Sequence, residues 1–434
     1  MKKSAIWHPM TQHKIFPEMI NIDRGQGAYL YTQDGREILD GISSWWLNTH
    51  GHCHPKIVEA VQAQAAQLDQ VIFAGFTHAP AEQLAETLLA KTRESMGQKN
   101  DKQLEHIFFS DSGSTAIEVA LKMAVGYFKQ TGQPKSKIVA LENGYHGDTI
   151  GTMSAGARGV FNEIYEPFLF DVEYLPFPSA GQEAATLAAF EKTLNGGDVA
   201  ALVLEPLVQG AAGMQIYSPK TLKALYDLCQ KHGALMIADE VMTGFGRTGT
   251  MFACEQAGFA PDLLCLSKGI TGGFLPMGAT LCTAAIYDAF YDDSRAKQFF
   301  HSTSFTGNAL ACAAANASLA IWDEEPVAAR LAMIEAAHQD AAVRFNARDD
   351  VSDVRTMGTI FALDIIDETD GYLSDLGVRL YKTYLERGIL LRPIGNCVYI
   401  LPPYCITKDE LERIYDCIER SLDDLKNERA QRAA

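Results

Sequence analysis

The chain has 434 residues, of which 47% are hydrophobic and 21% are charged. It is about three times as long as a ~150-residue domain and has enough apolar residues for a large core, which argues against a small binding module and a disordered chain. Its 37 Lys and Arg residues against 54 Asp and Glu residues give a net charge of −17, which would repel nucleic acid and an anionic membrane surface.

The first 50 residues predict a β-hairpin. The segment GQGAYLYTQDGREILDG, residues 25–41, places two short strands around an Asp34-Gly35 turn, a pair that favours tight antiparallel hairpins. Gly25 and Gly27 lack the third glycine and the strand-then-helix context of a dinucleotide-binding fingerprint. We therefore do not expect a dinucleotide cofactor.

Short apolar runs alternate with helical patterns through the middle of the chain. Hydrophobicity is continuous within each run, which is typical of strands buried on both faces of a mainly parallel sheet. We expect strands at 107–109, 137–141, 201–204, 234–238 and 263–266, and helices at 115–128 and 221–232. This alternation predicts an α/β fold.

The composition changes after about residue 320. We expect charged helices at 324–345, strands within 359–365 and 388–403, a closing helix from Lys408 and a polar tail at 427–434. The predicted division is an N-terminal segment at 1–50, a large domain at 51–320 and a small α+β domain at 321–434.

Cysteine usage and the absence of targeting signals in the sequence predict a cytoplasmic protein. The nine cysteines include no CxxC pair, which indicates reduced thiols. No apolar run follows the two N-terminal lysines, and no stretch of about 18 apolar residues occurs, so we expect neither a signal peptide nor a membrane span. His50, His52, Cys53 and His54 lie beside two tryptophans, where packing explains them, and we expect no metal.

Two strand ends carry the strongest chemical signal. Asp239 and Glu240 follow an apolar run, and a carboxylate at the edge of a dry site is costly unless it meets a cation, such as a protonated pyridine nitrogen. Lys268 follows a second apolar run, where loss of solvation lowers the pKa of its amine and favours a Schiff base with an aldehyde. The alternative for Lys268 is a solvated lysine, but the neighbouring Gly269 favours close backbone approach.

A third signal is the segment FFSDSGSTAIEVALKMA, a strand followed by a Gly/Ser turn and a helix. The N–H groups at the start of this helix attract anions, so Ser112, Gly113 and Ser114 would cradle a phosphate. Taken alone, such a turn is more often a plain helix cap. Together with the aspartate and the lysine, it completes the three anchors that pyridoxal phosphate needs, for phosphate, ring nitrogen and aldehyde.

These motifs resemble those of a known family. DEVMTGFGRTG, SKGITGG, ENGYHGD and HSTSFTGN are similar to segments of class-III, fold-type-I aminotransferases. More narrowly, IWHPMT, DGISSWWLNTHGHCHP, VIFAGFTHAPA and RPIGNCVYILPPY resemble the diaminopelargonate synthases, a subfamily that aminates 8-amino-7-oxononanoate to 7,8-diaminononanoate in biotin synthesis. The resemblance implies pyridoxal phosphate, a large domain with a mainly parallel seven-stranded sheet, a small α+β domain built from both termini, and a homodimer with shared active sites.

The resemblance also implies roles for cofactor-binding residues. Lys268 would bind the aldehyde covalently and later shuttle a proton, and Asp239 would keep the pyridine nitrogen protonated. Tyr145 would stack on one face of the ring and Val241 would press on the other. Ser112, Gly113 and Ser114 would bind the phosphate, and Ser304 would reach it from the second copy of the chain.

For the substrates, the resemblance implies that Arg392 pairs with the distal carboxylate of the keto acid. Trp45 and Tyr399 would line the aliphatic channel, and Asp148 would lie near the ammonium group of the donor. Trp46 is expected only to pack. Three further residues match family positions near the site, with roles left open: Glu205, Gln209 and Arg247.

The amino donor stays open between two candidates. After IWHP the subfamily commonly has an aromatic residue, often tyrosine, whereas this chain has Met10, which removes a hydroxyl from the channel. S-adenosylmethionine is the commoner donor and is our expectation, although GFLPMGATL is somewhat closer to a branch that uses lysine. The alternatives in function are other class-III enzymes of the ornithine, acetylornithine or GABA type, an aminomutase, and a non-catalytic regulator, for which the charge argues against a DNA-binding module.

Overall fold

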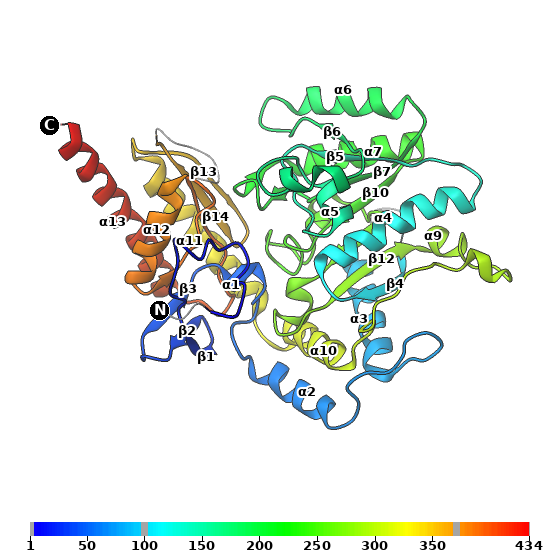
Figure 1. Ribbon diagram of the computed structural model, residues 1–434, viewed down its shortest axis with the longest axis horizontal. Coiled ribbons are helices and arrows are strands. Elements are labelled where there is room, and N and C mark those ends of the chain that lie inside the picture. The colour runs from blue at the N-terminus through cyan, green and yellow to red at the C-terminus, as the bar shows by residue number, and fades with distance from the viewer. Residues whose placement is uncertain (1–3, 97–102, 368–373, 434) are drawn as a thin grey trace.

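The computed structural model describes residues 4–96, 103–367 and 374–433, and a seven-stranded sheet forms its larger part (Figure 1). The strand order is β4-β12-β11-β10-β7-β5-β6. Neighbouring strands are parallel, except that β12 is antiparallel to both β4 and β11. The strands are β4 (Leu104–Ser110), β5 (Lys137–Leu141), β6 (Glu173–Leu175), β7 (Val199–Leu204), β10 (Leu235–Asp239), β11 (Leu263–Leu266) and β12 (Gly278–Thr283). The predicted α/β fold with a mainly parallel sheet is confirmed.

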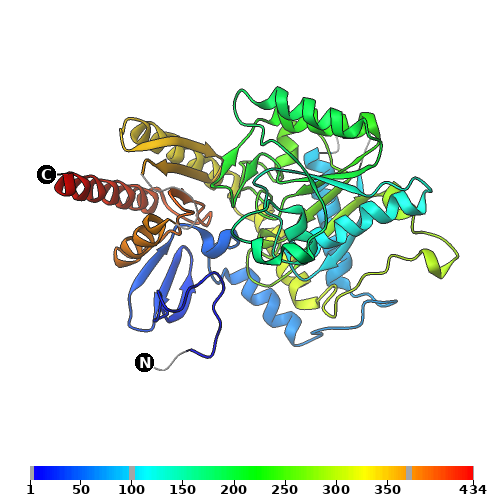
Figure 2. The ribbon, with the colours of Figure 1, turned by 45° about the horizontal axis from the view of Figure 1, so that its top comes forward.

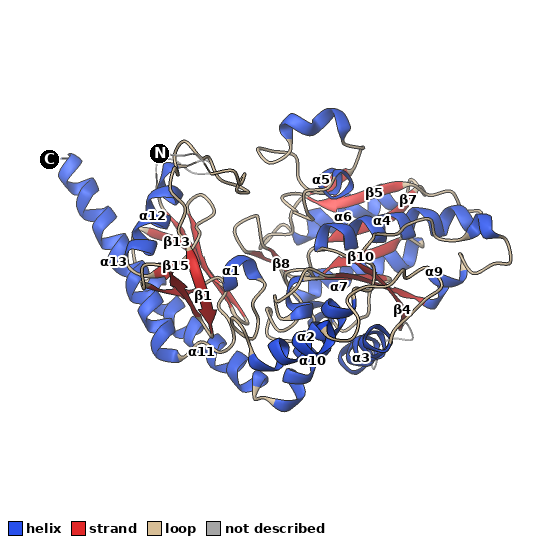
Figure 3. Ribbon diagram, turned by 60° about the horizontal axis from the view of Figure 1, so that its bottom comes forward, coloured by secondary structure: helices blue, strands red, loops and turns tan. Residues whose placement is uncertain are grey.

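Two hydrophobic cores, one on each face of this sheet, explain the continuous apolar runs. In β10, Leu235 and Ile237 join the core that contains the buried face of α4, whereas Met236 and Ala238 join the second core. Helices flank the strands on both sides (Figure 3). Among the helices of the described ranges, none is long and apolar enough to cross a membrane.

Within the described ranges, helices, three of them short 3-10 helices, and one short β-hairpin surround the large sheet. The helices are α2 (Pro55–Ala65), α3 (Ala79–Met96), α4 (Gly113–Gln130), α5 (Ile150–Ala155), η1 (Glu163–Phe168), α6 (Glu183–Leu194), α7 (Pro219–His232), α8 (Ala253–Ala257), η2 (Lys268–Thr271), α9 (Ala284–Asp288), η3 (Arg295–Lys297) and α10 (Ala309–Glu324). The hairpin is formed by β8 (Val208–Gln209) and β9 (Gln215–Ile216).

Segments from both ends of the chain lie together on one side of the large sheet (Figures 1 and 2). Strand β15 pairs in parallel with β3, where Ile389 lies opposite Leu39. The predicted hairpin is confirmed, since β2 and β3 are antiparallel around the turn that contains Gly35 at φ 85°. The elements are β1 (Ile22–Gln26), β2 (Tyr29–Thr32), β3 (Glu37–Asp40), α1 (Ser43–Trp46), α11 (Val327–Asn346), β13 (Val351–Met357), β14 (Ile360–Ile365), α12 (Asp375–Glu386), β15 (Ile389–Leu390), β16 (Cys397–Ile400) and α13 (Lys408–Ala433). The boundaries of the predicted domains stay a prediction.

The polar tail continues the closing helix, because α13 extends through residues 427–433. This segment is rich in Glu, Arg, Gln and Ala, which have high helix propensity. Two ion pairs join it to neighbouring segments, Arg379 with Glu428 at 2.6 Å and Arg429 with Asp367 at 2.8 Å. Residue 434 lies outside the described ranges.

Candidate active site

Asp239 and Lys268 lie at the carboxyl ends of two adjacent parallel strands. Asp239 ends β10 and is in register with Cys265 of β11, and Lys268 follows β11 by two residues. Lys268 has φ 44°, so the chain turns sharply where its side chain leaves the strand. Gly269 permits the backbone beside Lys268 to approach Phe245 closely, because a Cβ there would lie 3.0 Å from the side chain of Phe245. Asp239 and Lys268 therefore lie at the same edge of the sheet, where the sequence predicts them.

A buried histidine holds Asp239. His146 Nδ1 lies 2.7 Å from Asp239 Oδ2, and the N–H of Val241 donates to Oδ1 at 3.1 Å. Burial alone would lower the pKa of His146, but the hydrogen bond and the charges of Asp239 and Glu205 outweigh it and raise that pKa. The pair therefore keeps a proton donor against the Asp239 carboxylate and fixes its orientation.

Glu240, the second acid of the strand end, faces away from this site. Its carboxylate accepts hydrogen bonds from the N–H groups of Ala253 at 2.7 Å and Cys254 at 2.9 Å, at the start of α8. Burial raises the pKa of Glu240 to about 7, although those hydrogen bonds oppose the shift. Of the two adjacent carboxylates, Asp239 alone is turned toward His146.

The amine of Lys268 loses its proton more readily than that of an exposed lysine. Burial lowers its pKa to about 8, against the opposing charges of Asp239 and Glu205. Its Nζ lies 4.9 Å from the centre of the Trp46 ring. A neutral amine beside an aromatic wall is a nucleophile suited to an aldehyde.

This pKa predicts how the apoprotein captures pyridoxal phosphate. The protonated amine is unreactive, so the capture rate should rise about tenfold per pH unit below pH 8 and level off above it. Stopped-flow absorbance at pH 6 to 10 measures the rate, with N-acetyl-lysine, which should level off only near pH 10.4, as the reference amine. A capture rate that keeps rising to pH 10 would contradict a desolvated Lys268.

The turn at the start of α4 has the form of an anion cradle. Ser112 caps the helix, since its hydroxyl accepts from the N–H of Thr115 at 3.2 Å. The first N–H groups of a helix have no intrahelical acceptor, so those of Gly113 and Ser114 are available to an anion. A Cβ at Gly113 would lie 2.7 Å from the side chain of Val241 and would fill the cradle. The hydroxyl of Ser112 thus has a structural role in addition to its predicted one.

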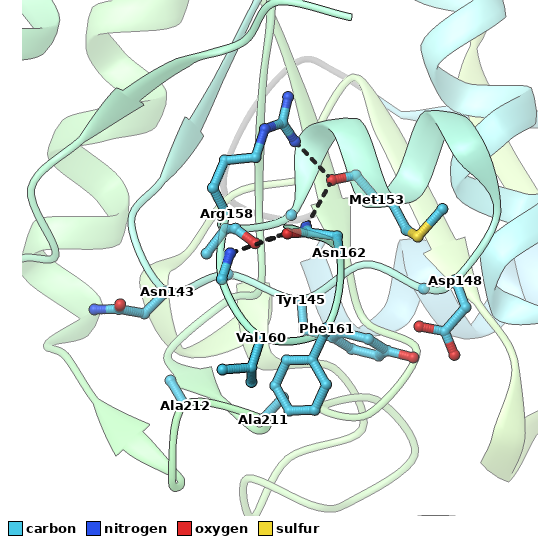
Figure 4. Close-up of a pocket in the computed structure, with 15 residues that line it drawn as sticks. Asn143, Tyr145, Asp148, Met153, Arg158, Val160, Phe161, Asn162, Ala211 and Ala212 are labelled. Atoms are coloured by element: carbon cyan, nitrogen blue, oxygen red, sulfur yellow. Dashed lines mark hydrogen bonds between the residues drawn. The ribbon is translucent and has the colours of Figure 1, made fainter. Parts of the chain in front are cut away.

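A cavity of about 210 Å³ opens beside Tyr145 and Asp148 (Figure 4). Burial and a hydrogen bond with Asp148 raise the pKa of Tyr145, so its hydroxyl keeps its proton. The N–H of Asp148 donates to Ser114 Oγ at 3.3 Å, which ties this loop to the start of α4. Val160 and Phe161 add apolar surface to the cavity. The structure thus joins Tyr145, Asp148 and the anion cradle.

The two adjacent tryptophans, Trp45 and Trp46, contact different residues. The Arg392 guanidinium lies 5.2 Å from the centre of the Trp45 ring and donates to the carbonyl of Met10 at 2.9 Å. The indole N–H of Trp46 donates to the hydroxyl of Tyr399 at 3.1 Å, and the same ring faces Lys268. Trp46, which was expected only to pack, therefore also lies in the wall of the site.

Ser304 lies on an exposed loop, and its backbone carbonyl contacts Gln70 rather than the cradle. Its carbonyl accepts from Gln70 Nε2 at 3.4 Å, and the neighbouring Thr303 donates to Asp111 at 2.8 Å. The predicted contact of Ser304 with a phosphate in a second copy of the chain stays a prediction.

The three residues whose roles were left open are buried close to these groups. Glu205 accepts from the N–H groups of Tyr145 at 3.1 Å and Gly210 at 2.9 Å, and burial raises its pKa to about 7. Gln209 donates to the carbonyl of Glu142 at 3.0 Å. The Arg247 guanidinium donates to the carbonyl of Pro402 at 2.7 Å and lies 5.0 Å from the Tyr404 ring centre. These contacts support loops around the site.

Comparison with known proteins assigns the family. A model of class-III aminotransferases matches residues 10–422. The chain belongs to the class-III aminotransferases. Pyridoxal phosphate is the cofactor of this family, and the chain is a pyridoxal-phosphate-dependent transaminase.

Curated and solved relatives of this class-III aminotransferase match nearly its full length. The adenosylmethionine-8-amino-7-oxononanoate aminotransferase of Synechococcus elongatus is 48% identical, covering 97% of this chain and 99% of that one. The crystal structure of an enzyme with the same name from Methanocaldococcus jannaschii has a TM-score of 0.90 at 33% identity and covers 97% of both chains. A PLP-bound amine transaminase from an uncultivated Pseudomonas species has a TM-score of 0.88 at 32% identity, covering 98% of this chain and 99% of that one.

The geometry of this class-III aminotransferase fits the cofactor of its family. The cradle at Gly113 is open because the residue has no side chain, and Lys268 has a lowered pKa. The Nε2 atom of His146 is buried without a hydrogen-bond partner among the described residues. Within the same ranges, no group of three His, Cys, Asp or Glu residues is arranged to hold a metal ion.

Proposed function

We propose that the chain transfers an amino group to 8-amino-7-oxononanoate, forming 7,8-diaminononanoate for biotin synthesis in the cytoplasm. The observation that carries this proposal is the Arg392 guanidinium, 5.2 Å from the Trp45 ring, while the adjacent Trp46 faces Lys268. A long aliphatic keto acid with a terminal carboxylate matches this arrangement, because aromatic rings pack on methylene groups and a guanidinium pairs with a carboxylate. The 48% identical relative carries the name of this activity.

Residues on three segments of the chain hold the cofactor in this proposal. The N–H groups of Gly113 and Ser114, with Ser112, bind the phosphate at the start of α4. Asp239, oriented by His146, would pair with the ring nitrogen. Two side chains, Tyr145 and Val241, would pack on the two faces of the ring. When bound, pyridoxal phosphate supplies an aldehyde that exchanges for an amino group and a ring that accepts electrons.

Lys268 has two tasks in this mechanism. Its Nζ is neutral above about pH 8 and would bind the cofactor aldehyde. Once released, the amine would carry a proton between the substrate carbon and the aldehyde carbon of the cofactor. The Trp46 ring shields the amine from water. Tyr145, Asp239 and Lys268 are the residues that we expect to contact the reacting groups.

Arg392→Ala is expected to weaken the keto-acid half reaction selectively. Loss of one charge-assisted contact to the substrate carboxylate should raise the KM for 8-amino-7-oxononanoate roughly 30- to 100-fold. The donor half reaction should change less than about threefold, because it does not use that carboxylate. Single-turnover absorbance measures each half separately. Arg24→Ala is the control. The Arg24 guanidinium also lies over an aromatic ring, 3.5 Å from the centre of Tyr31, but Arg24 belongs to β1 and has no proposed role in substrate binding.

The donor in this proposal is S-adenosylmethionine, whose ammonium group lies near Asp148 in the cavity beside Tyr145. The purified holoenzyme is mixed with S-adenosylmethionine and, separately, with lysine, while absorbance follows conversion of the cofactor to its pyridoxamine form. Conversion by S-adenosylmethionine followed by reconversion with 8-amino-7-oxononanoate supports the proposal. Conversion by lysine alone would replace the donor, and failure of the keto acid to reconvert the cofactor would overturn the substrate.

A homodimer with shared sites is part of this proposal. The loop that carries Ser304 also exposes Phe305, and the large exposed side chains of Phe300 and Ile72 add to an apolar surface typical of protein interfaces. Ser304 of one copy reaches the phosphate in the other. Ser304→Ala should therefore raise the Kd of pyridoxal phosphate about tenfold, measured by equilibrium dialysis, with the dimer mass unchanged in sedimentation. An unchanged Kd would contradict the shared site.

A further inference from the structure

The turn that carries both tryptophans has a backbone that non-glycine residues rarely adopt. Ser43, Ser44 and Trp46 have φ values of 52°, 61° and 68°, and Trp45, between Ser44 and Trp46, has φ −133° and ψ 56°. Positive φ strains a residue that has a Cβ, and three such residues within four persist only where other contacts enforce the conformation. The strain places the rings of Trp45 and Trp46 against different groups, Arg392 and Lys268.

A buried carboxylate supplies the enforcing contacts. Asp40 has no exposed surface and ends β3 just before the turn. Its Oδ1 accepts from the N–H of Ile42 at 3.1 Å, and its Oδ2 accepts from the N–H of Ser44 at 2.7 Å and from the Ser44 hydroxyl at 3.3 Å. These bonds are satisfied only while the backbone curls back over β3.

His52 holds the carboxylate in turn. Its Nε2 lies 2.8 Å from Asp40 Oδ2, and its Nδ1 lies 3.1 Å from Asn48 Nδ2. Its backbone forms a bridge with Gly27, and Gly25 leaves room for its side chain, because a Cβ there would lie 2.9 Å from the His52 Cβ. The two glycines of the N-terminal GQG segment thus seat a histidine.

We infer that Asp40 and His52 are positioning residues for keto-acid recognition: they hold the strained Ser43–Trp46 turn that presents Trp45 to Arg392 and Trp46 to Tyr399 and Lys268. This inference rests on the proposed function for the identity of the substrate. Neither residue touches the reacting atoms. Their effect is on binding geometry, which depends on the two rings being held a few ångströms from their cationic partners.

Asp40→Asn tests the inference against a matched control. Asparagine has a single side-chain oxygen, so it cannot accept both hydrogen bonds, and the turn loses the bond from the N–H of Ser44 or of Ile42. The KM for 8-amino-7-oxononanoate should rise about tenfold, with kcat within about twofold, and the near-ultraviolet circular dichroism of the tryptophans should change in the holoenzyme without substrate. Asp262→Asn is the control, because Asp262 is likewise buried and accepts a backbone N–H, from Met236 at 2.9 Å, away from the tryptophans.

A rescue separates positioning from a general loss of structure. Adding Ser44→Gly to Asp40→Asn removes the steric penalty at φ 61°, so the turn can form without the carboxylate, and the KM should return to within about threefold of wild type. If Asp40→Asn does not fold, His52→Leu is measured against His52→Gln, which keeps a donor for Asp40, and leucine should raise the KM the more.

Three outcomes would overturn the inference. They are wild-type KM and dichroism in Asp40→Asn, equal losses in Asp40→Asn and Asp262→Asn, and equal KM values in the two His52 variants. A wild-type enzyme that does not use 8-amino-7-oxononanoate would instead refute the proposed function, and the change in tryptophan dichroism in Asp40→Asn would still report on the turn.

Discussion

Lys268→Ala is expected to abolish transamination, with a loss of roughly 10⁴-fold or more in kcat. In the proposed mechanism this side chain is the amine that captures the cofactor; its Nζ lies 4.9 Å from the centre of the Trp46 ring, and its pKa is lowered by burial. The variant should also lose the absorbance band that a lysine-linked pyridoxal phosphate gives. Its Tm should stay within a few degrees of wild type, because removing a desolvated amine does not break a packed core.

The control for this variant is Lys231→Ala, which removes a surface lysine paired with Glu191 at 2.6 Å. It should keep both activity and the absorbance band. Borohydride reduction of the wild-type holoenzyme, followed by peptide mapping, should place the cofactor on Lys268. A Lys268→Ala protein that keeps the band, or a label on another lysine, would contradict the assigned role.

The fold was predictable wherever a segment's own pattern determines its structure. Strands β5 and β11 have the predicted bounds, because each is buried on both faces between the two cores and reads as an uninterrupted apolar run. By contrast, β15 has two residues and exists through its pairing with β3, some 350 positions earlier. A two-residue strand carries no periodicity, so its partner cannot be inferred from the local sequence.

The positions of the candidate-site residues in the fold were predictable where one element delivers one group. Asp239, Lys268 and the Ser112–Ser114 turn each follow a recognisable strand, and parallel strands bring their ends to one edge. His146 was missed although it adjoins Tyr145 in ENGYHGD, because its partner Asp239 lies 93 residues away. Trp46 was expected only to pack. The strained backbone that directs the rings of Trp45 and Trp46 toward different partners has no signature in the local sequence.

The side to which the Glu240 carboxylate points could not be predicted from the sequence either. Asp239 and Glu240 are adjacent at the end of β10 and contact different partners, and either one alone satisfies the local sequence pattern. The structure distinguishes them through distant partners: His146 beside Asp239, and the start of α8 beside Glu240. This difference between neighbouring carboxylates makes a matched pair of substitutions possible.

Asp239→Asn is expected to lower kcat by roughly 10²- to 10³-fold, or about 3–4 kcal/mol of transition-state stabilisation. The amide keeps the shape of the side chain but removes the charge that favours a protonated ring nitrogen, and it weakens the 2.7 Å contact with His146. The pKa of His146, raised by Asp239, should fall toward the lower value that burial favours. NMR titration of the histidine and steady-state kinetics measure the two effects.

Glu240→Gln is the matched control for Asp239→Asn, because it neutralises the adjacent buried acid, which caps α8 and faces away from the site. It should lower the Tm by a few degrees through weakened bonds to Ala253 and Cys254, while kcat stays within about threefold of wild type. Equal losses of kcat in the two variants would mean that the effect of Asp239→Asn is structural. A large loss confined to Asp239→Asn places the electrostatic role on the carboxylate that His146 holds.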